Sequence, residues 1–284
     1  MSPSTYPQAA PPPPRPSAHP DGPEPAGTPR KSGNSRTRLI LAVGAVAVIG
    51  LLILTVAVIA GGGDSPAASG GGSAGGAGSA HAVTAPLEGR QKATFEVVTG
   101  AESLTVRSDD LGDDLYRIST PEDGNLVPNA VVTGDNVLLA LDGSGKVGGA
   151  ASVEVLLNDQ VIWQLKLAGG GLKETIDFGT GKLSGVDLAS GAGEIELSLP
   201  KATGTLAVKL TGGAGKFTVH LAKDLPVQVK IDGAGAGVVT IDGQTKNAVK
   251  AGTELAPSEW ASATDRYTVE ASAGVSNLVV DRTT

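Results

Sequence analysis

The sequence predicts an all-β fold: a single-stranded, right-handed parallel β-helix that follows one N-terminal transmembrane helix. Three observations support this prediction: a glycine motif that recurs every 22 residues, alternation of apolar and polar residues around it, and an uninterrupted apolar stretch near the N-terminus. A fixed repeat of 20–50 residues is typical of solenoids, and period-two alternation is typical of strands with one buried face. The chain is therefore expected to divide into an anchoring part and a large folded domain.

The apolar stretch covers residues 39–60 and contains no charged side chain. A helix of 22 residues is long enough to cross the roughly 30 Å hydrocarbon core of a bilayer. Four basic residues lie within 30–38, whereas glycines and Asp64 follow the stretch, so the positive-inside rule places residues 1–38 in the cytoplasm. A cleaved signal peptide is the alternative, but its N-terminal and apolar regions would be unusually long. We therefore predict an uncleaved, single-pass anchor in the cell membrane, with the C-terminal domain outside.

Two segments flank this predicted span. Residues 1–38 contain 11 of the 18 prolines, which predicts a disordered or polyproline tail. This tail is either a docking peptide for a domain that reads polyproline or simply a solvated segment. Residues 61–87 are rich in Gly, Ser and Ala and are predicted to form a flexible linker. An end-to-end distance of about 25–30 Å would keep the domain predicted at 88–284 close to the membrane.

Charge and cysteine content exclude several classes of partner and site. The tail carries five basic and two acidic residues (net +3), and the remainder carries 17 basic and 27 acidic residues (net −10). An acidic outer domain does not favour nucleic acid or anionic lipid as a partner. The chain contains no cysteine, which excludes disulfides, cysteine-based metal sites and a thiol nucleophile.

The repeat is clearest at Gly191, Gly213 and Gly235, which are spaced by 22 residues, and a final copy begins at Ser272 after an insertion of about 17 residues. Each copy has one alternating strand before the glycines and one after them. We expect seven or eight coils, each strand lying beside its copy one repeat away, with glycines supplying positive φ at the corners. A β-sandwich is the alternative, but it does not predict glycines aligned at a fixed interval.

Several of these segments resemble the bacterial toast-rack or adhesin-like domains, which include the C-terminal domain of LiaF-type cell-envelope stress proteins. The segments are SGAGEIELSLP, GGAGKFTVHL, DLPVQVKIDGAGAGVVTIDG and ATDRYTVEASAGVSNLVVD, together with the late Trp260. The resemblance covers about residues 95–282 and is strongest over 187–282. It implies a single-stranded right-handed β-helix and, in some members, regulation of an envelope-sensing histidine kinase. The single predicted span departs from the LiaF pattern, which has several.

No motif for catalysis or cofactor binding is complete. Residues 143–146 (GSGK) lack the Ser/Thr that a phosphate loop requires after its lysine, and the glycines of 233–237 precede a strand rather than a helix. The best cation candidates are four carboxylates that do not match an EF-hand spacing: Asp109, Asp110, Asp113 and Asp114. We predict no catalytic, cofactor-binding or metal-ligating residue, and no cofactor.

Four further side chains are considered as site residues. His220 is expected to point outward, and without a second usable histidine a His-based triad or metal site is not predicted. Glu194 and Glu196 are the remaining carboxylates for an enzyme of the glycosidase type. Trp260 lies in the insertion, where it either folds back onto the solenoid or contacts a partner.

We therefore predict a membrane-anchored, non-enzymatic interaction or sensory-regulatory module of the bacterial cell envelope. Its expected partner is a membrane or envelope protein. The alternative is an adhesin-like binding module for an envelope glycan or lipid.

Overall fold

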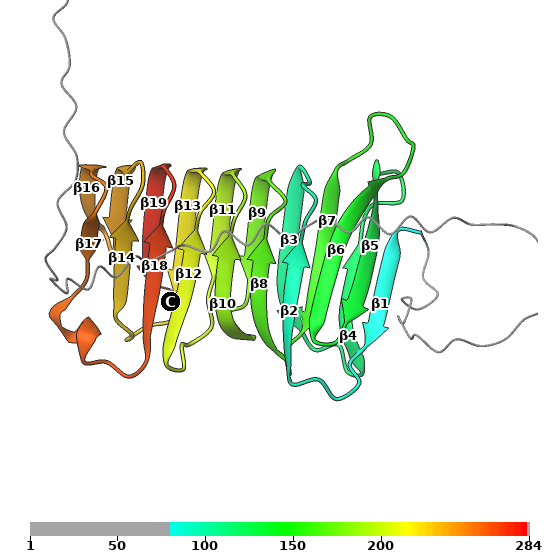
Figure 1. Ribbon diagram of the computed structural model, residues 1–284, viewed down its shortest axis with the longest axis horizontal. Helices are drawn as coiled ribbons and strands as arrows, with labels where there is room; N and C mark the ends of the chain where they lie inside the picture. The colour runs from blue at the N-terminus through cyan, green and yellow to red at the C-terminus, as the bar shows by residue number, and fades with distance from the viewer. Residues whose placement is uncertain (1–79, 283–284) are drawn as a thin grey trace, which may run out of the picture. The chain divides into compact units, whose positions relative to one another are not determined.

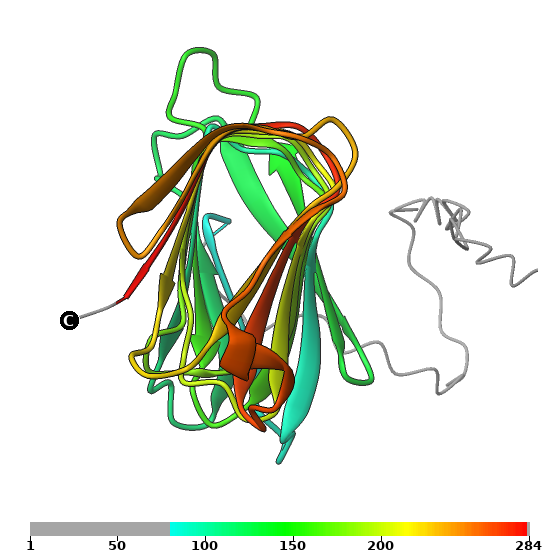
Figure 2. The ribbon, with the colours of Figure 1, turned by 90° about the vertical axis from the view of Figure 1, so that its left-hand side faces the viewer.

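The computed structural model describes residues 80–282, which form two large β-sheets that face each other (Figures 1 and 2). The predicted tail (1–38), the predicted span (39–60) and most of the predicted linker (61–87) lie outside the described residues. Within the described part of the chain, no helix has the length and apolar character needed to cross a bilayer. Its one helix is the short 3₁₀ helix η1 (Ser258–Ala261), so the predicted all-β class is confirmed.

Each sheet combines strands from early and late parts of the described chain. From one edge to the other, sheet A consists of β17 (Thr253–Leu255), β14 (Val227–Ile231), β18 (Arg266–Ala271), β12 (Thr205–Leu210), β10 (Lys182–Leu188), β8 (Ile162–Leu167), β2 (Lys92–Val97), β6 (Asn136–Gly143) and β5 (Leu126–Thr133). In the same direction, sheet B consists of β16 (Gln244–Val249), β15 (Ala236–Ile241), β19 (Val275–Arg282), β13 (Ala214–Leu221), β11 (Ala192–Ser198), β9 (Gly171–Asp177), β3 (Ser103–Asp109), β7 (Ser152–Asn158), β4 (Asp114–Ser119) and β1 (Ala82–Pro86).

One sheet A strand, a tight turn and the following sheet B strand make one coil, and neighbouring coils pair in parallel. In space the coils follow the order β14–β15, β18–β19, β12–β13, β10–β11, β8–β9, β2–β3 and β6–β7. In the middle of this stack Ile195 pairs with Phe217 and Leu197 with Val219, each 22 residues apart. The predicted 22-residue coil is confirmed there, and parallel pairing disfavours the antiparallel β-sandwich.

The order of the coils differs from the prediction at both ends of the stack. β18–β19 lies between β12–β13 and β14–β15, and β2–β3 lies between β6–β7 and β8–β9. The expectation that every strand lies beside its copy one repeat away is therefore wrong for these two inserted coils. Nearly all inward positions of the coils are apolar, so this pattern alone does not specify which coils are neighbours.

A row of charges on the outer face of sheet A provides one physical reason for this order. Seven side chains in register alternate in sign along the sheet: Glu96, Lys166, Asp187, Lys209, Glu270, Lys230 and Glu254. In strict chain order Lys209 and Lys230 would be direct neighbours, and like charges in that arrangement are destabilising. Strand β18 places Glu270 between them. We call this row the charge ladder.

Antiparallel strands close both ends of the parallel stack. Strands β1, β4 and β5 cover one end, and β16 and β17 cover the other. Such caps limit further strand addition to an exposed sheet edge. Strands β16 and β17 come from the predicted insertion, whereas β1 lies inside the segment predicted as linker. The linker boundary at residue 87 is therefore corrected, because Ala82–Pro86 finds backbone partners in β4.

Alternating inward side chains form one continuous core between the sheets. Six of the seven aromatic side chains in residues 80–282 are fully buried: Phe95, Tyr116, Trp163, Phe178, Phe217 and Tyr267. Phe95 and Trp163 meet edge to face, with ring centroids 6.4 Å apart. The indole N–H of Trp163 donates to the carbonyl oxygen of Asn158 at 3.0 Å, so the buried polar group is satisfied.

The turns from sheet A to sheet B stack along one side of the domain, which we call the glycine corner (Figure 2). Positive φ was predicted for Gly191, Gly213 and Gly235, but among these only Gly235 has it (φ +83°). A different constraint acts at Gly212, where a Cβ would lie 1.9 Å from the carbonyl oxygen of Ser190 in the next coil. Close approach of neighbouring coils, more than turn conformation, requires glycine at this corner.

Candidate interaction surface

The outer face of sheet B presents polar side chains in register. His220 lies between two carboxylates: its Nδ1 is 2.5 Å from Asp281 Oδ1, and its Nε2 is 3.5 Å from Glu196 Oε1. These residues come from adjacent strands β11, β13 and β19. The outward orientation predicted for His220 is confirmed, with the side chain 27% exposed. The histidine therefore links three strands on an open surface.

An ion pair lies on the same face. Lys216 Nζ donates to Glu194 Oε1 at 2.9 Å, and Lys173 lies on the strand beyond Glu194. This hydrogen bond and the positive charge of Lys216 hold the pKa of Glu194 below its usual value. The same hydrogen bond and the negative charge of Glu194 raise the pKa of Lys216. We call the exposed group Lys173, Glu194, Glu196, Lys216, His220 and Asp281 the sheet B platform. Its alternating charges suit it to ion pairs and hydrogen bonds with a partner surface.

The platform lacks the arrangement that a nucleophilic enzyme needs. Ser198 is directly opposite His220 in the strand register, yet no hydrogen bond joins the two side chains. The histidine instead contacts carboxylates through both ring nitrogens. Activation of a serine requires that its hydroxyl reach the imidazole, so this Ser-His-Asp row does not form a triad.

Three of the four aspartates considered as a cation site are held by local side-chain contacts. Asp109 Oδ1 accepts from the backbone N–H of Asp110, and Asp110 Oδ1 accepts from that of Gly112. Asp114 pairs with Arg117 at 3.1 Å. Within residues 80–282, no group of three or more acidic or histidine side chains is placed to hold a metal ion. In this structure Asp109, Asp110 and Asp114 stabilise a turn and a strand start.

Trp260 folds back onto the solenoid. Its indole N–H donates to the carbonyl oxygen of Tyr267 at 2.8 Å, and the guanidinium of Arg266 lies 4.4 Å from its ring centroid. Arg266 also donates to the carbonyl oxygens of Trp260 and Ala261. These contacts hold η1 against strand β18. Trp260 therefore folds back onto the solenoid, which is the first of its two predicted roles.

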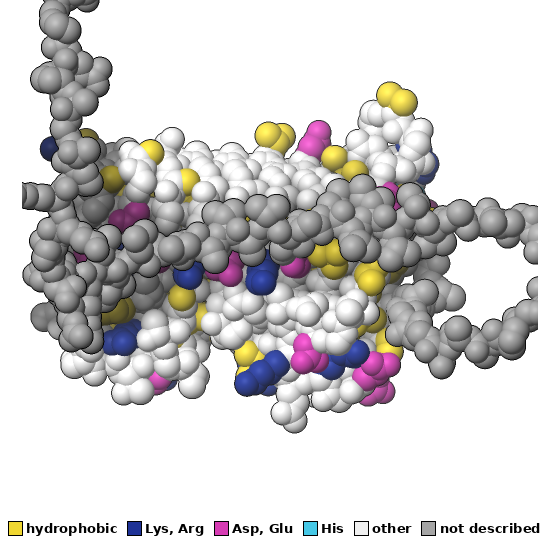
Figure 3. Space-filling view, viewed as in Figure 1, with side chains coloured by type: hydrophobic (Ala, Val, Ile, Leu, Met, Phe, Trp, Pro, Cys, Tyr) yellow, Lys and Arg dark blue, Asp and Glu magenta, His cyan; other side chains and the backbone are white. Residues whose placement is uncertain are grey.

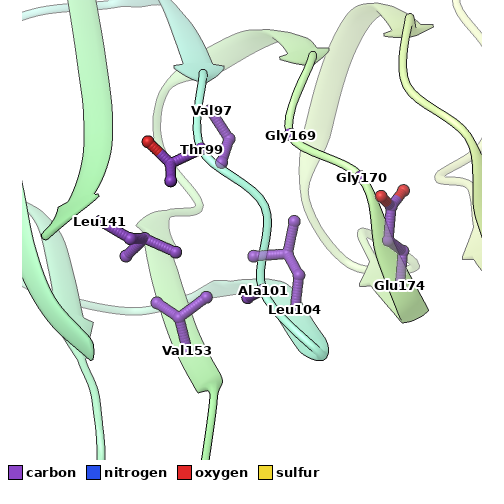
Figure 4. Close-up of a pocket in the computed structure, with 9 residues that line it drawn as sticks. All are labelled: Val97, Thr99, Ala101, Leu104, Leu141, Val153, Gly169, Gly170 and Glu174. Carbon is purple, nitrogen blue, oxygen red and sulfur yellow. The ribbon is translucent and has the colours of Figure 1, made fainter. Parts of the chain in front are cut away.

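The carboxylate of Glu174 is buried (Figure 4), and the sequence did not single this residue out. It is 1% exposed and lies in register between Leu104 and Ile195. Neither carboxylate oxygen has a hydrogen-bond partner, and the nearby Ser190 hydroxyl donates to the carbonyl oxygen of Gly169 instead. Burial raises the pKa of Glu174 to about 7, although Ser190 lowers it in part. The signal was available: alternation places Glu174 where the next coil has Ile195.

Comparison with known proteins adds to this geometry. Residues 78–220 match the family described as the N-terminal domain of toast_rack, DUF2154, and these residues make up half of the chain. The chain belongs to the toast-rack family. This match includes the N-terminal inserted coil, whereas the sequence resemblance is strongest over 187–282. No curated protein matches the toast-rack chain.

Two solved structures are similar to the toast-rack domain. One is a proposed cell adhesion protein from Clostridium sporogenes, with 17% identity and a TM-score of 0.55, over 71% of this chain and 98% of that one. It supports the fold alone. The other is a proposed adhesin from Bacteroides fragilis, with 10% identity and a TM-score of 0.25, over 70% of this chain and 98% of that one. A TM-score this low carries no argument about the fold.

Proposed function

We propose that this toast-rack protein is a non-enzymatic binding module of the bacterial cell envelope that contacts a membrane or envelope protein through the sheet B platform. The anchor at residues 39–60 and the right-handed sense of winding belong to the same proposal. The observation that carries it is the platform itself, a flat face of paired charges with no activated nucleophile. A sensory-regulatory role would follow if the partner were a receptor kinase.

The platform suits protein recognition for two physical reasons. Its side chains project from parallel strands with about 4.8 Å between neighbours, so their positions are set by the backbone of a rigid solenoid. Charges arranged on such a surface favour specificity and rapid association more than raw affinity. The likeness to a proposed cell adhesion protein agrees with a binding role.

Glycan binding, part of the alternative, finds less support. Sugar-binding surfaces commonly use exposed aromatic rings, whereas six of the seven rings in residues 80–282 are fully buried. The seventh, Trp260, is stacked against Arg266. Of the two ligands in that alternative, lipid is therefore better supported than glycan.

The test is photo-crosslinking of the full-length protein in living cells, with and without an antibiotic that damages the wall. A crosslinking amino acid at Lys173 samples the platform, and one at Lys209 samples the opposite sheet as a matched control. We expect a protein adduct from position 173 and none from position 209, with a stress-dependent amount if the role is sensory. Adducts with only wall or lipid material, or equal adducts from both faces, would contradict the proposal.

A further inference from the structure

The charge ladder on sheet A ends in apolar side chains at one edge of the sheet. In the row that contains Glu96, the next two positions are Leu138 on β6 and Val131 on β5, which pair directly with each other. They are 41% and 50% exposed, respectively. In Figure 3, charges of alternating sign run along the face of sheet A and give way to hydrophobic side chains over β6 and β5. The exposed apolar row therefore reaches the outermost strand.

Strand β5 is that outermost strand, and its outer backbone edge is open. The N–H of Val98 donates to the carbonyl oxygen of Leu139, so the odd-numbered residues of β6 direct their backbone groups at β2. The even-numbered residues of β6 therefore face β5, and their pairing leaves the backbone groups of Pro128, Ala130 and Val132 directed away from the sheet. Within residues 80–282, these outward N–H and C=O groups have no hydrogen-bond partner.

This edge also lacks the features that usually protect an outer strand. Proteins keep such strands short or place charged residues on them. The other outer strands follow this rule: β1 and β17 have five and three residues, and β16 carries Lys246. Strand β5 has eight residues and no charged side chain. An open backbone edge beside exposed apolar side chains is suited to pairing with a further strand.

The backbone of β5 matches a second copy of itself. With two copies antiparallel about a two-fold axis at Val131, Ala130 of each copy faces Val132 of the other, and each pair exchanges both N–H···O=C bonds. Pro128, which has no N–H, then faces Gly134 in the turn beyond the strand. An axis at Ala130 would instead place Pro128 opposite Val132, whose carbonyl would lack a donor. The axis at Val131 is therefore the better match.

The side chains agree with the same axis. The row Glu96, Leu138, Val131 would continue into Val131, Leu138 and Glu96 of the second copy, so four apolar side chains would meet between two carboxylates. Because β5 is uncharged, no like charges on the two paired strands would face each other. A self-complementary patch is what a two-fold dimer requires. For this reason we favour a second copy of the chain over an unrelated strand.

We infer that β5 pairs with β5 of a second copy, antiparallel about a two-fold axis at Val131, so that the two A sheets join into one. The inference goes beyond the proposed function and depends neither on the predicted anchor nor on the sheet B platform. The axis is perpendicular to the joined sheet, so the two platforms would lie on the same side of the dimer. A partner with two binding sites would then be held more tightly than by one copy.

The absence of cysteine from the chain allows single substitutions in the full-length protein in cells to test this register. The two Val131 Cα atoms would lie about 4.5 Å apart, within the range that a disulfide spans. Thr133→Cys on the same strand is the matched control, because its Cα would lie about 14 Å from its copy. We expect mild oxidation to give a covalent dimer for Val131→Cys and none for Thr133→Cys.

Two further variants test the pairing itself. Asn129→Cys alone should give no dimer, but co-expression with Thr133→Cys should give one, because these two positions face each other across the axis. Ala130→Pro removes an N–H that the fold does not use, and proline is tolerated at such edge positions. It should therefore leave the thermal midpoint unchanged and abolish the dimer formed by Val131→Cys.

Three results would overturn the inference. They are no dimer from Val131→Cys, as much dimer from Thr133→Cys as from Val131→Cys, and a dimer that persists with Ala130→Pro. An adduct of Val131→Cys with a different protein would assign this edge to a strand of that protein and would also overturn the inference. None of these results bears on the sheet B platform, which is tested separately from position 173.

Discussion

The three middle coils, β8–β9, β10–β11 and β12–β13, follow one another in chain order, whereas β2–β3 and β18–β19 are inserted between coils distant in sequence. Both kinds of coil have apolar residues at nearly all inward positions, and both pair in parallel with their neighbours. In the middle, the short turn between consecutive coils places each coil directly beside the next one in the chain. Near the ends, more than one stacking order of the coils would bury the same core. Side chains outside the core help to select the observed order.

The glycine corner shows the same distinction. Gly169, Gly212 and Gly233 each face a peptide of the adjacent coil, at Thr99, Ser190 and Ser272 respectively. In space the coils with glycine at this contact alternate with those that carry Thr or Ser. In chain order the alternation fails, because the coils of Gly212 and Gly233 would then be adjacent. The corner and the charge ladder thus favour the same order of coils.

The largest expected effect comes from removing the inserted C-terminal strand. Truncation before Val275 removes three buried side chains, Val275, Leu278 and Val280. At about 1.5–3 kcal/mol each, the loss is about 5–9 kcal/mol, similar to the whole stability of a domain. We expect no cooperative thermal unfolding transition. Removal of Thr283 and Thr284 alone is the control, and a truncated chain that melts like this control would show that the inserted coil is dispensable.

Glu174 lies on β9, where the inserted coil β2–β3 packs against the middle coils, so its titration tests this contact. Its pKa is about 7 in the folded protein and about 4.5 when unfolded, so the folded state binds more protons between these values. Stability should therefore fall as pH rises from about 4.5 to about 7, by about 3 kcal/mol in total. Glu174→Gln should remove this decline in denaturant titrations at pH 5 and pH 8. The exposed Glu194→Gln should retain it, and a wild-type protein with no decline would contradict the assignment.

The glycine corner offers a matched pair one residue apart. Gly212→Ala should destabilise the fold by about 2 kcal/mol, because the new Cβ meets the backbone of Ser190 at 1.9 Å. Gly213→Ala should change stability by less than about 1 kcal/mol, because its Cβ would lie 3.5 Å from the nearest atom and its φ is not positive. Urea midpoints measure both. Equal effects would show that close packing of coils is not the constraint.

The charge ladder should give the smallest effect. Glu270→Lys would place three positive charges in a row with Lys209 and Lys230, at a cost of about 1 kcal/mol at low salt. Glu254→Lys, at the edge of the sheet, has only one such neighbour and should cost less. High salt should reduce both differences. If Glu270→Lys is neutral at low ionic strength, the ladder does not influence coil order.

Much of the candidate surface could be predicted from local patterns. Alternation placed His220 outward and Phe217 inward, and both positions are confirmed. It could not show that Asp281, 61 residues later, lies beside His220, because that contact depends on the inserted strand β19. Glu174 was missed because a charged residue at an inward position is unusual, although alternation with the buried Ile176 and Phe178 indicated it.

By itself the sequence determined the β class, the 22-residue coil and the inward face of the strands in the repeat, because these depend on neighbours a few residues apart. Only the tertiary structure decided which coils are adjacent and where the carboxylate of Glu174 lies. The physical reason is that coils with one shared core pattern can stack in several orders. The order is then selected by weaker contacts, such as charge alternation and backbone fit, which exist only after distant segments meet.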